Sequence, residues 1–222
     1  MKKKEKKGVI FDLDGVLVDS MPTHVQAWRD AFLKITGLDI TERDIYLLEG
    51  MRGMELVNKI FEQKNFPDYD LAKATHDEKS KIFKTIRVSE PFNGVKDIID
   101  TIKCHKAVVS GSAKKDVEII LEETIGKDKF EIIITADDVE KGKPDPSSFL
   151  EALKRMKIRL EEAVVVENAP LGAEAANNAG VDCYVVLNNT PLKRSDFSGV
   201  IAQDRIFERT DSLKEVLDEL CE

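Results

Sequence analysis

The 222-residue chain is predicted to fold as a doubly wound α/β core, a parallel sheet with helices on both faces, carrying a helical insert. Two observations support this prediction. Strand-like and helix-like segments alternate along most of the chain, which is typical of a parallel sheet. Residues 19–89 contain no strand-like segment at all, so this interval is predicted to be helical.

Five short segments rich in β-branched residues are predicted to form the strands. The first, GVIFDLDG, stops at Gly15, and the second, KAVVSGS, ends at Ser110. Three more follow later in the chain: EIIITA, EAVVVEN and DCYVVLN. Each is short and bounded by charged or turn-forming residues, as expected for strands in the interior of a parallel sheet.

Amphipathic helices are predicted between the strands, because apolar residues recur there at helical spacing. Two such series are Val95, Ile98, Ile99 and Ile102, and Leu213, Val216, Leu217 and Leu220. These helices would cover the sheet with their apolar faces.

The insert is predicted to contain several helices. Ser20 and Pro22 favour a helix start, and TERDIYLLEG, MELVNKIFEQ and LAKATHDEKSKIFKTI are predicted to form further helices. Because the insert follows the first strand directly, it should lie over the carboxyl ends of the strands, where open parallel sheets bind ligands. We therefore expect a core domain of residues 1–18 and 90–222 and a cap domain of residues 19–89.

Composition excludes several classes of function. The formal net charge is −8 and no basic stripe with aromatic residues occurs, so no nucleic-acid partner is expected. The longest apolar runs are too short for a membrane span, and no apolar segment after MKKKEKK suggests a signal peptide. Cys104, Cys183 and Cys221 lie far apart in no metal-ligand pattern, which predicts reduced thiols in a cytoplasmic protein. The oligomeric state is not readable from the sequence.

Candidate catalytic groups stand at two strand ends. Asp12 and Asp14 are two residues apart, so their side chains point to the same face, and Gly15 then allows a sharp turn. Two such carboxylates repel each other unless a cation or a shared proton compensates. Glu167 and Asn168 follow a run of valines and offer one charged and one uncharged oxygen ligand at a rigid strand end.

These motifs resemble those of the haloacid dehalogenase (HAD) superfamily of phosphohydrolases and phosphomutases. FDLDGVLVDS is similar to the first motif of that family, VVSGS to the second, KGKPDP to the third and VVVENAPLGAEAANNAG to the fourth. All four occur in order, and the resemblance spans the whole chain, including the cap. It implies a Rossmann-like core and an enzyme that transfers phosphoryl groups.

The resemblance implies a role for each catalytic candidate. Asp12 would be the nucleophile that forms an aspartyl-phosphate. Asp14 would protonate the leaving group and then deprotonate the attacking water. Ser110 would hydrogen-bond the phosphoryl group, and Lys143 would balance the charges of the nucleophile and the phosphate. These roles meet the needs of phosphoryl transfer, which depends on positioning and on neutralisation of charge.

The expected cofactor is Mg²⁺, because hard oxygen ligands are present and no His or Cys cluster favours zinc. Asp12, the backbone carbonyl of Asp14, and Asn168 are the candidate ligands, with Glu167 as a further one that alternatively caps the strand end. Relatives mostly carry aspartate where Asn168 stands, so this chain gives up one carboxylate. The Glu-Gly in the cap loop and the ENAPLG motif resemble those of inorganic pyrophosphatases close to the phosphoglucomutases, and we therefore expect Glu49 to complete the metal shell when the cap closes.

Five further residues are candidates for substrate binding. The amides of Gly111 and Ser112, expected at the start of the next helix, form a natural anion site. Lys114 is either a phosphate contact or an exposed lysine. His24 and Arg52 are expected at the substrate, the alternatives being a buried structural histidine and an exposed charge at a helix end.

The predicted function is Mg²⁺-dependent hydrolysis of a small phosphorylated metabolite through an aspartyl-phosphate. An inorganic pyrophosphatase, acting on pyrophosphate, is one alternative. A sugar-phosphate mutase of the β-phosphoglucomutase type is another, because the cap sequence and HVQAW resemble that branch of the family. A non-catalytic phosphate-binding regulator is the third, and only the amide at Asn168 favours it.

Overall fold

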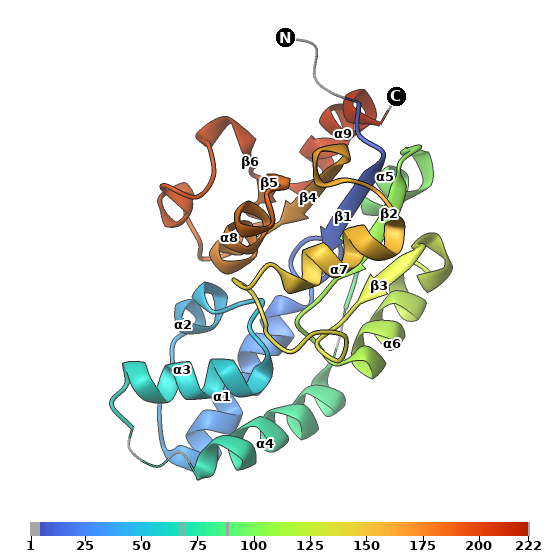
Figure 1. The fold of residues 1–222 in the computed structure, drawn as a ribbon. Coiled ribbons are helices and arrows are strands. Elements are labelled where there is room, and N and C mark those ends of the chain that lie inside the picture. The colour runs from blue at the N-terminus through green and yellow to red at the C-terminus, as the bar shows by residue number, and fades with distance from the viewer. Residues whose placement is uncertain (1–4, 67, 69, 88, 222) are drawn as a thin grey trace.

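The computed structural model describes residues 5–66, 68, 70–87 and 89–221. Within these residues six strands form one parallel sheet in the order β3-β2-β1-β4-β5-β6 (Figure 1). The strands are β1 Gly8–Asp12, β2 His105–Val109, β3 Ile132–Ile134, β4 Ala163–Glu167, β5 Asp182–Val186 and β6 Ile206–Phe207. The predicted doubly wound fold is confirmed.

The strand order reverses at β1. This strand pairs with β2 on one side and with β4 on the other, and Asp12 aligns with Val109 of β2. Phe11 is the last residue of β1 that pairs with β4, and its partner is Val166. Glu167 and Asn168 therefore follow the end of this pairing. Ligands of open parallel sheets bind where the strand order reverses, at the carboxyl ends of the strands.

Both faces of the sheet are buried, which explains the continuous apolar runs in its strands. Alternate residues of β1 and β4 face opposite sides, with Ile10 and Val165 in one apolar cluster and Phe11 and Val166 in the other. Helices α7 (Ser147–Met156) and α8 (Pro170–Ala179) contribute to the first cluster. Helices α5 (Val95–Thr101), α6 (Lys114–Thr124) and α9 (Lys214–Leu220) contribute to the second.

Between β1 and α5 the described residues form four helices. They are α1 Met21–Thr36, α2 Glu42–Leu47, α3 Gly53–Gln63 and α4 Leu71–Ile86. Helices α1 and α4 lie side by side, and the arrowhead of β1 points toward this group of helices (Figure 1). We refer to these four helices and the loops between them as the cap helices. The exact division into domains at residues 19 and 89 stays a prediction.

The chain enters and leaves the cap helices through two adjacent segments. The amide of Asp19 donates to the carbonyl of Glu90 at 2.8 Å, and Val18 pairs with Pro91 in an antiparallel bridge. The amide of Phe92 then donates to the carbonyl of Leu17 at 3.1 Å. The cap helices are therefore joined to the sheet by a narrow double connection directly beside Asp12 and Asp14.

The structure corrects three expectations. Five strands are predicted, but the sheet has a sixth, β6, whose two residues are too few to give a sequence pattern. Helix α6 begins at Lys114, so Gly111 and Ser112 lie in the loop before it. Cys104 and Cys221 form a disulfide, so the prediction of three reduced thiols is wrong for these two, and Cys183 is free. The pairing was not predicted because the two cysteines are 117 residues apart in sequence.

Among the described residues, no helix is long and apolar enough to cross a membrane.

Candidate active site

Candidate catalytic residues from four strands or strand ends meet at one edge of the sheet. Asp12 is the last residue of β1, Ser110 follows β2, and Glu167 is the last residue of β4. Lys143 comes from the loop between β3 and α7. All of these side chains are buried, with exposed fractions of 5% or less. The topology of the sheet thus assembles groups that are more than a hundred residues apart in sequence.

Lys143 is held between two carboxylates. Its Nζ donates to Oδ1 of Asp12 and to Oε1 of Glu167. Burial lowers the pKa of Lys143, but the two carboxylates outweigh burial and raise it, so the side chain is a permanent cation. The Nζ atom also lies 5.2 Å from the centre of the Phe149 ring. The Lys143–Pro144 peptide bond is cis.

Glu167 uses both carboxylate oxygens within the protein. Its Oε2 accepts the backbone N–H groups of Asn168 at 3.0 Å and Ala169 at 3.3 Å, at the N-terminus of α8. Gly172 provides the space, because a Cβ atom there would lie 2.1 Å from Cδ of Glu167. The structure therefore places Glu167 as the partner of Lys143, and its role as a metal ligand stays a prediction.

Asp14 accepts hydrogen bonds from three hydroxyl groups. Ser20 donates to its Oδ1, and Ser110 and Ser112 donate to its Oδ2 at 3.2 and 3.4 Å. Burial raises the pKa of Asp14, but the electrostatic interaction and hydrogen bond with His24 and the hydrogen bond from Ser20 outweigh burial and lower it. Ser20, expected to cap α1, makes no capping hydrogen bond, because its hydroxyl binds Asp14 instead.

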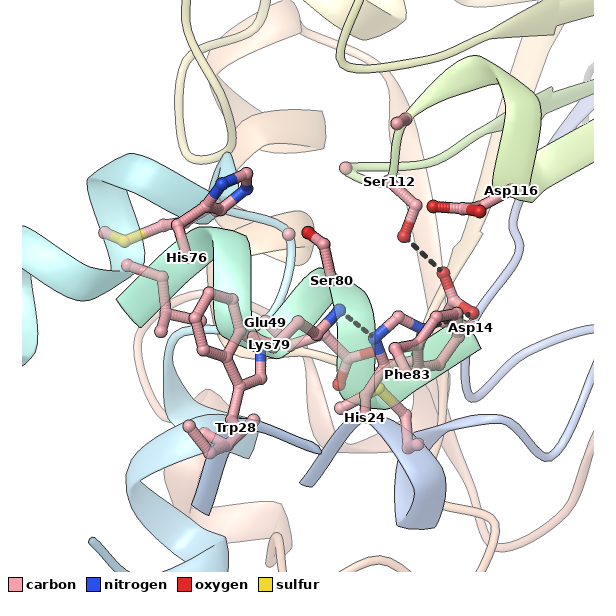
Figure 2. A pocket seen from close by; sticks show the side chains of 18 of the residues that line it. Asp14, His24, Trp28, Glu49, His76, Lys79, Ser80, Phe83, Ser112 and Asp116 are labelled. Carbon is pink, nitrogen blue, oxygen red and sulfur yellow. Dashed lines mark hydrogen bonds and ion pairs between the residues drawn. The ribbon is translucent and has the colours of Figure 1, made fainter. Parts of the chain in front are cut away.

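His24 and Lys79 form a pair that faces Asp14. Lys79 Nζ lies 3.0 Å from Nδ1 of His24, and Figure 2 shows the two groups pointing toward each other. An ammonium group only donates, so Nδ1 is the acceptor and the proton of neutral His24 is on Nε2, 3.3 Å from Oδ1 of Asp14. Burial, followed by the charge of Lys79, lowers the pKa of His24, although Asp14 opposes this shift. The lowered pKa favours the neutral form.

Lys79 is enclosed by aromatic rings. Its Nζ lies 4.4 Å from the centre of the Phe83 ring and 5.2 Å from that of Trp28. Burial lowers the pKa of Lys79 to about 8, although Asp14 and Asp116 favour its charged form. No sequence pattern distinguishes this residue, because α4 carries other lysines at its surface and the contact with His24 spans 55 residues.

Glu49 and Asn168 make the contact between the cap helices and the end of β4. The Nδ2 of Asn168 donates to both carboxylate oxygens of Glu49, at 2.9 Å each. Gly15 allows this approach, because a Cβ atom there would lie 2.1 Å from Nδ2 of Asn168. Burial raises the pKa of Glu49, and the charge of Asp12 adds to this effect.

The donor set fits a magnesium ion. Oδ1 of Asn168 is buried and has no hydrogen-bond partner among the described residues, as expected for an oxygen that coordinates a cation. The carboxylates of Asp12, Asp14, Glu49 and Glu167 lie close enough to act on one another, and Lys143 binds only Asp12 and Glu167, so a bound cation would offset surplus negative charge. In the described part of the chain, no three His, Cys, Asp or Glu side chains are grouped as ligands of one ion. A site that uses Asp12, the Asp14 carbonyl and Asn168 does not need such a group.

A cavity of about 150 Å³ lies between these residues and the cap helices. Figure 2 shows Asp14, Ser112 and Asp116 on one side of it, and Trp28, His76 and Lys79 on the other. Asp12, His24, Glu49 and Gly111 also line it. This volume is sufficient for a small phosphorylated molecule.

Two predicted substrate-binding residues lie outside this cavity. Lys114 is exposed, and its backbone N–H donates to Asp137 at 2.9 Å. Arg52 donates through Nη1 to the backbone carbonyl of Glu140. Sequence reasoning missed Asp116, His76, Lys79 and Ser80 as lining residues, because no motif contains them.

Comparison with known proteins identifies the family. The family model for haloacid dehalogenase-like hydrolases matches residues 9–186. The chain therefore belongs to the haloacid dehalogenase-like hydrolases, as its four motifs indicate, and it is an enzyme of the phosphatase type.

Individual relatives support this assignment. The chain is 30% identical over 188 residues to fructose-1-phosphate phosphatase YqaB of Escherichia coli K12, a match that covers 81% of this chain and 95% of that protein. It is 28% identical over 219 residues to the phosphorylated carbohydrates phosphatase of Thermotoga maritima, covering 95% of this chain and 100% of that protein. Among solved structures, a protein provisionally identified as a β-phosphoglucomutase from Bacteroides vulgatus superposes with a TM-score of 0.86 at 30% identity, over 97% of this chain and 89% of that one.

Proposed function

We propose that the protein is a Mg²⁺-dependent phosphatase that hydrolyses small phosphorylated carbohydrates through an aspartyl-phosphate at Asp12. The observation that carries this proposal is the position of Asp12, which lines the cavity while its carboxylate is bound by Lys143. Burial raises the pKa of Asp12, and Lys143 opposes that effect, so the lysine helps to keep the nucleophile ionised.

The first half of the reaction transfers the phosphoryl group to the protein. An oxygen of Asp12 forms a bond to phosphorus, and the bond from phosphorus to the leaving oxygen breaks. The proton of Asp14 passes to that oxygen, which leaves as a neutral hydroxyl group. Asp14 takes up this proton beforehand, because a bound phosphate dianion beside it raises its pKa.

The second half returns the protein to its starting state. Asp14 removes a proton from water, the resulting oxygen attacks phosphorus, and the bond to Asp12 breaks to release inorganic phosphate. Ser110 and Ser112, whose hydroxyl groups already lie beside Asp14, would donate to the phosphoryl oxygens. Lys143 remains between Asp12 and Glu167 and balances the charge that develops on the nucleophile.

Magnesium would be held by Asp12, the Asp14 backbone carbonyl and Asn168, with Glu49 nearby. When bound, it supplies positive charge that neutralises the phosphoryl oxygens. Asn168 contributes no charge to this set, and the carboxylate of Glu49 beside it offsets that loss.

The character of the cavity favours a leaving group that carries hydroxyl groups and no charge. Away from Asp12 the lining combines one cation, Lys79, with one carboxylate, Asp116, and with the aromatic rings of Trp28 and Phe83. Such a mixture suits a sugar or polyol, which has apolar faces and hydroxyl donors and acceptors, better than a second phosphate group. Two relatives are named as phosphatases of carbohydrate phosphates.

Two alternatives each rest on a specific observation. The contact between Glu49 and Asn168 favours an inorganic pyrophosphatase, because a cap residue this close to the nucleophile leaves little room for the leaving group. The structural likeness to a protein identified provisionally as a β-phosphoglucomutase favours a mutase. A non-catalytic regulator has no such support, because Asp12 and Asp14 line the cavity and Lys143 binds Asp12.

A screen of phosphate release separates these functions. The purified protein is incubated with hexose 1-phosphates, hexose 6-phosphates, pentose phosphates, phosphoglycolate and pyrophosphate, with and without Mg²⁺. We expect free phosphate from one or more carbohydrate phosphates, only with Mg²⁺, and none from the Asp12→Asn variant. Conversion of a hexose 1-phosphate to its 6-phosphate without free phosphate would show a mutase, and pyrophosphate as the best substrate would show the second alternative.

A further inference from the structure

A close seam joins the loop before α3 to the loop that carries Lys143. On the cap side the seam consists of residues 50–55, and on the core side of residues 140–143. The backbone N–H of Lys143 donates to the carbonyl of Gly50 at 3.1 Å. The adjacent N–H of Gly142 donates to the carboxylate of Glu55, at 3.2 Å to Oε2 and 3.4 Å to Oε1. Two consecutive amides of the Lys143 loop are thus bound by the cap helices.

Glu55 has a second function at its own helix. Its Oε2 also accepts the backbone N–H of Arg52 at 3.2 Å, at the N-terminus of α3. One carboxylate therefore binds an amide of the cap helices and an amide of the core. A hydrogen bond from a neutral donor to a charged acceptor is stronger than one between neutral groups, and this one lies at a partly buried position.

The glycines of the seam show how little space remains there. A Cβ atom at Gly142 would lie 2.6 Å from the backbone nitrogen of Arg52, and one at Gly50 would lie 2.6 Å from Cδ of Lys143. A Cβ atom at Gly111 would lie 3.0 Å from the carbonyl oxygen of Gly50. The two sides are in contact through their backbones, so a single methyl group is enough to separate them.

We propose that Glu55 is a positioning residue, which holds Lys143 between Asp12 and Glu167 by binding the amide of Gly142 across the seam. Lys143 itself contacts the two carboxylates, whereas Glu55 acts only through the loop backbone. When the cap helices separate from the core, both amide contacts are lost and the loop is released. Lys143 is then fixed at the nucleophile only while the cavity is closed, which links closure to the charge balance at Asp12.

The proposal rests on the proposed function in one respect, namely that Lys143 assists the reaction at Asp12. The contacts at the seam do not depend on any activity. The test therefore combines kinetics with a measurement on the protein alone, so that a failure of the proposed function can be told apart from a failure of the proposed role of Glu55.

The chain offers a matched control for the loss of the helix-end contact. Glu162 stands three residues after Arg159 as Glu55 stands three after Arg52, and its Oε2 accepts the Arg159 backbone N–H at 3.0 Å. It lies directly before β4, at the end of the sheet away from the cavity. Glu162→Ala therefore removes the same local hydrogen bond without affecting the seam.

Three further variants change the seam itself. Glu55→Ala removes both contacts of Glu55, and Glu55→Gln keeps an oxygen acceptor for both. Gly142→Ala keeps the Glu55 side chain but inserts a methyl group into the seam, where a Cβ atom would lie 2.6 Å from the Arg52 nitrogen and 2.7 Å from Oε2 of Glu55, at a residue whose backbone is not in the left-handed region. Each is assayed with the best substrate from the phosphate-release screen, in the presence of Mg²⁺.

The expected kinetic result is a loss of kcat with little change in KM. Glu55→Ala should lower kcat about tenfold or more, as for the loss of one hydrogen bond to a charged group. Gly142→Ala should do the same, Glu55→Gln should recover most of the activity, and Glu162→Ala should keep full activity. Both kcat and kcat/KM fall together when the lost contact supports the reacting state and not the binding of substrate.

Amide hydrogen exchange on the protein without substrate gives the second measurement. We expect faster exchange in the peptide that covers residues 140–143 for Glu55→Ala and Gly142→Ala, but not for Glu162→Ala. Unchanged exchange in that peptide, or a loss of kcat in Glu162→Ala equal to that in Glu55→Ala, overturns the role of Glu55. If the protein hydrolyses no phosphate ester, the proposed function fails, and the exchange rates still decide whether Glu55 fixes this loop.

Discussion

Asn168 Nδ2 lies 2.9 Å from each carboxylate oxygen of Glu49, which links the end of β4 to the loop before α3. This arrangement turns the other side of the amide, Oδ1, toward the interior without a partner among the described residues. In the proposed magnesium site this oxygen is an uncharged ligand, and the carboxylate of Glu49 beside it supplies negative charge. Because Glu49 belongs to the cap helices, affinity for the metal should depend on whether the cavity is closed.

Glu49→Ala should weaken the binding of Mg²⁺ about tenfold or more, because the metal then lacks the charge that Asn168 cannot supply. Asn168→Asp in the same background should recover part of that affinity. Binding is measured by isothermal titration of Mg²⁺ into the protein without substrate, and by the Mg²⁺ dependence of phosphate release. An unchanged Mg²⁺ affinity in Glu49→Ala would contradict the role of Glu49.

Asp12→Asn should abolish phosphate release, by about 10³-fold or more, because an amide does not form the acyl phosphate. The fold should be retained, since Lys143 keeps Glu167 as its second carboxylate partner. Activity is measured alongside the circular dichroism spectrum and the melting temperature. Full turnover by a folded Asp12→Asn protein is the result that would exclude the proposed mechanism.

Lys79 should give the stability of the protein a dependence on pH. Its folded pKa of about 8 lies below the ordinary value of 10.5, so between these limits the unfolded state binds more protons and the stability of the wild type rises with pH. Below pH 8 the buried charge is fully present in the wild type and destabilises it. Lys79→Met should therefore be more stable than the wild type below pH 8, and the difference should shrink toward pH 10.

The groups that face Lys79 are His24, Asp14 and Asp116, from three different segments, and the rings of Trp28 and Phe83. The free energy of unfolding is measured in urea at pH 7, 8, 9 and 10 for both proteins. A difference between the two proteins that does not change with pH would show that Lys79 titrates outside this range.

Asp116→Asn should shift the choice of substrate. The variant keeps a hydrogen-bonding side chain for hydroxyl groups but removes the negative charge that repels a second anionic group. The ratio of kcat/KM for pyrophosphate to that for the best carbohydrate phosphate should rise several-fold. The reason is that the variant loses a repulsion of about 1 kcal/mol between two negative charges in a partly solvated cavity. An unchanged ratio would show that the leaving group does not approach Asp116.

Reduction of the Cys104–Cys221 disulfide should lower the free energy of unfolding by about 4 kcal/mol, because the bond closes a long loop in the unfolded chain. Thiol titration in denaturant should give one reactive group before reduction, from Cys183, and three afterwards. Dithiothreitol should lower the melting temperature of the wild type and leave that of Cys104→Ser unchanged. Three reactive thiols before reduction would contradict the disulfide. A cytoplasmic location stays a prediction, and a structural disulfide does not favour it.

The fold was predictable because strong local patterns carried it. The valine run 164–166 and the segment GVIFD are completely buried, and short apolar runs of this kind are typical of interior strands of a parallel sheet. The two-residue strand β6 has no pattern to detect, and the start of α6 moved by several residues because Ser112 donates its amide to the hydroxyl of Ser110 instead of opening the helix.

The site was predictable only where residues stand in motifs. Asp12, Asp14, Ser110 and Lys143 meet as expected from the resemblance, and His24 lines the cavity. Lys79 and Asp116 lie on amphipathic helices whose other charged residues face solvent, so only the packing of α4 and α6 distinguishes them. Arg52 shows the reverse case, a charged residue in a promising loop whose guanidinium binds a carbonyl of the core and does not line the cavity, so its role at the substrate stays a prediction.

The double connection at Asp19 and Glu90 makes the cap helices an exchangeable module. Because these two residues are hydrogen-bonded to each other at 2.8 Å, the whole segment between them leaves and re-enters the sheet at almost the same point. A replacement of any length needs only to bring its two ends together, and the entropic cost of that closure grows slowly with length. A chimaera in which residues 19–90 are taken from a relative should therefore keep the reaction centre at Asp12 and acquire the donor's choice of substrate.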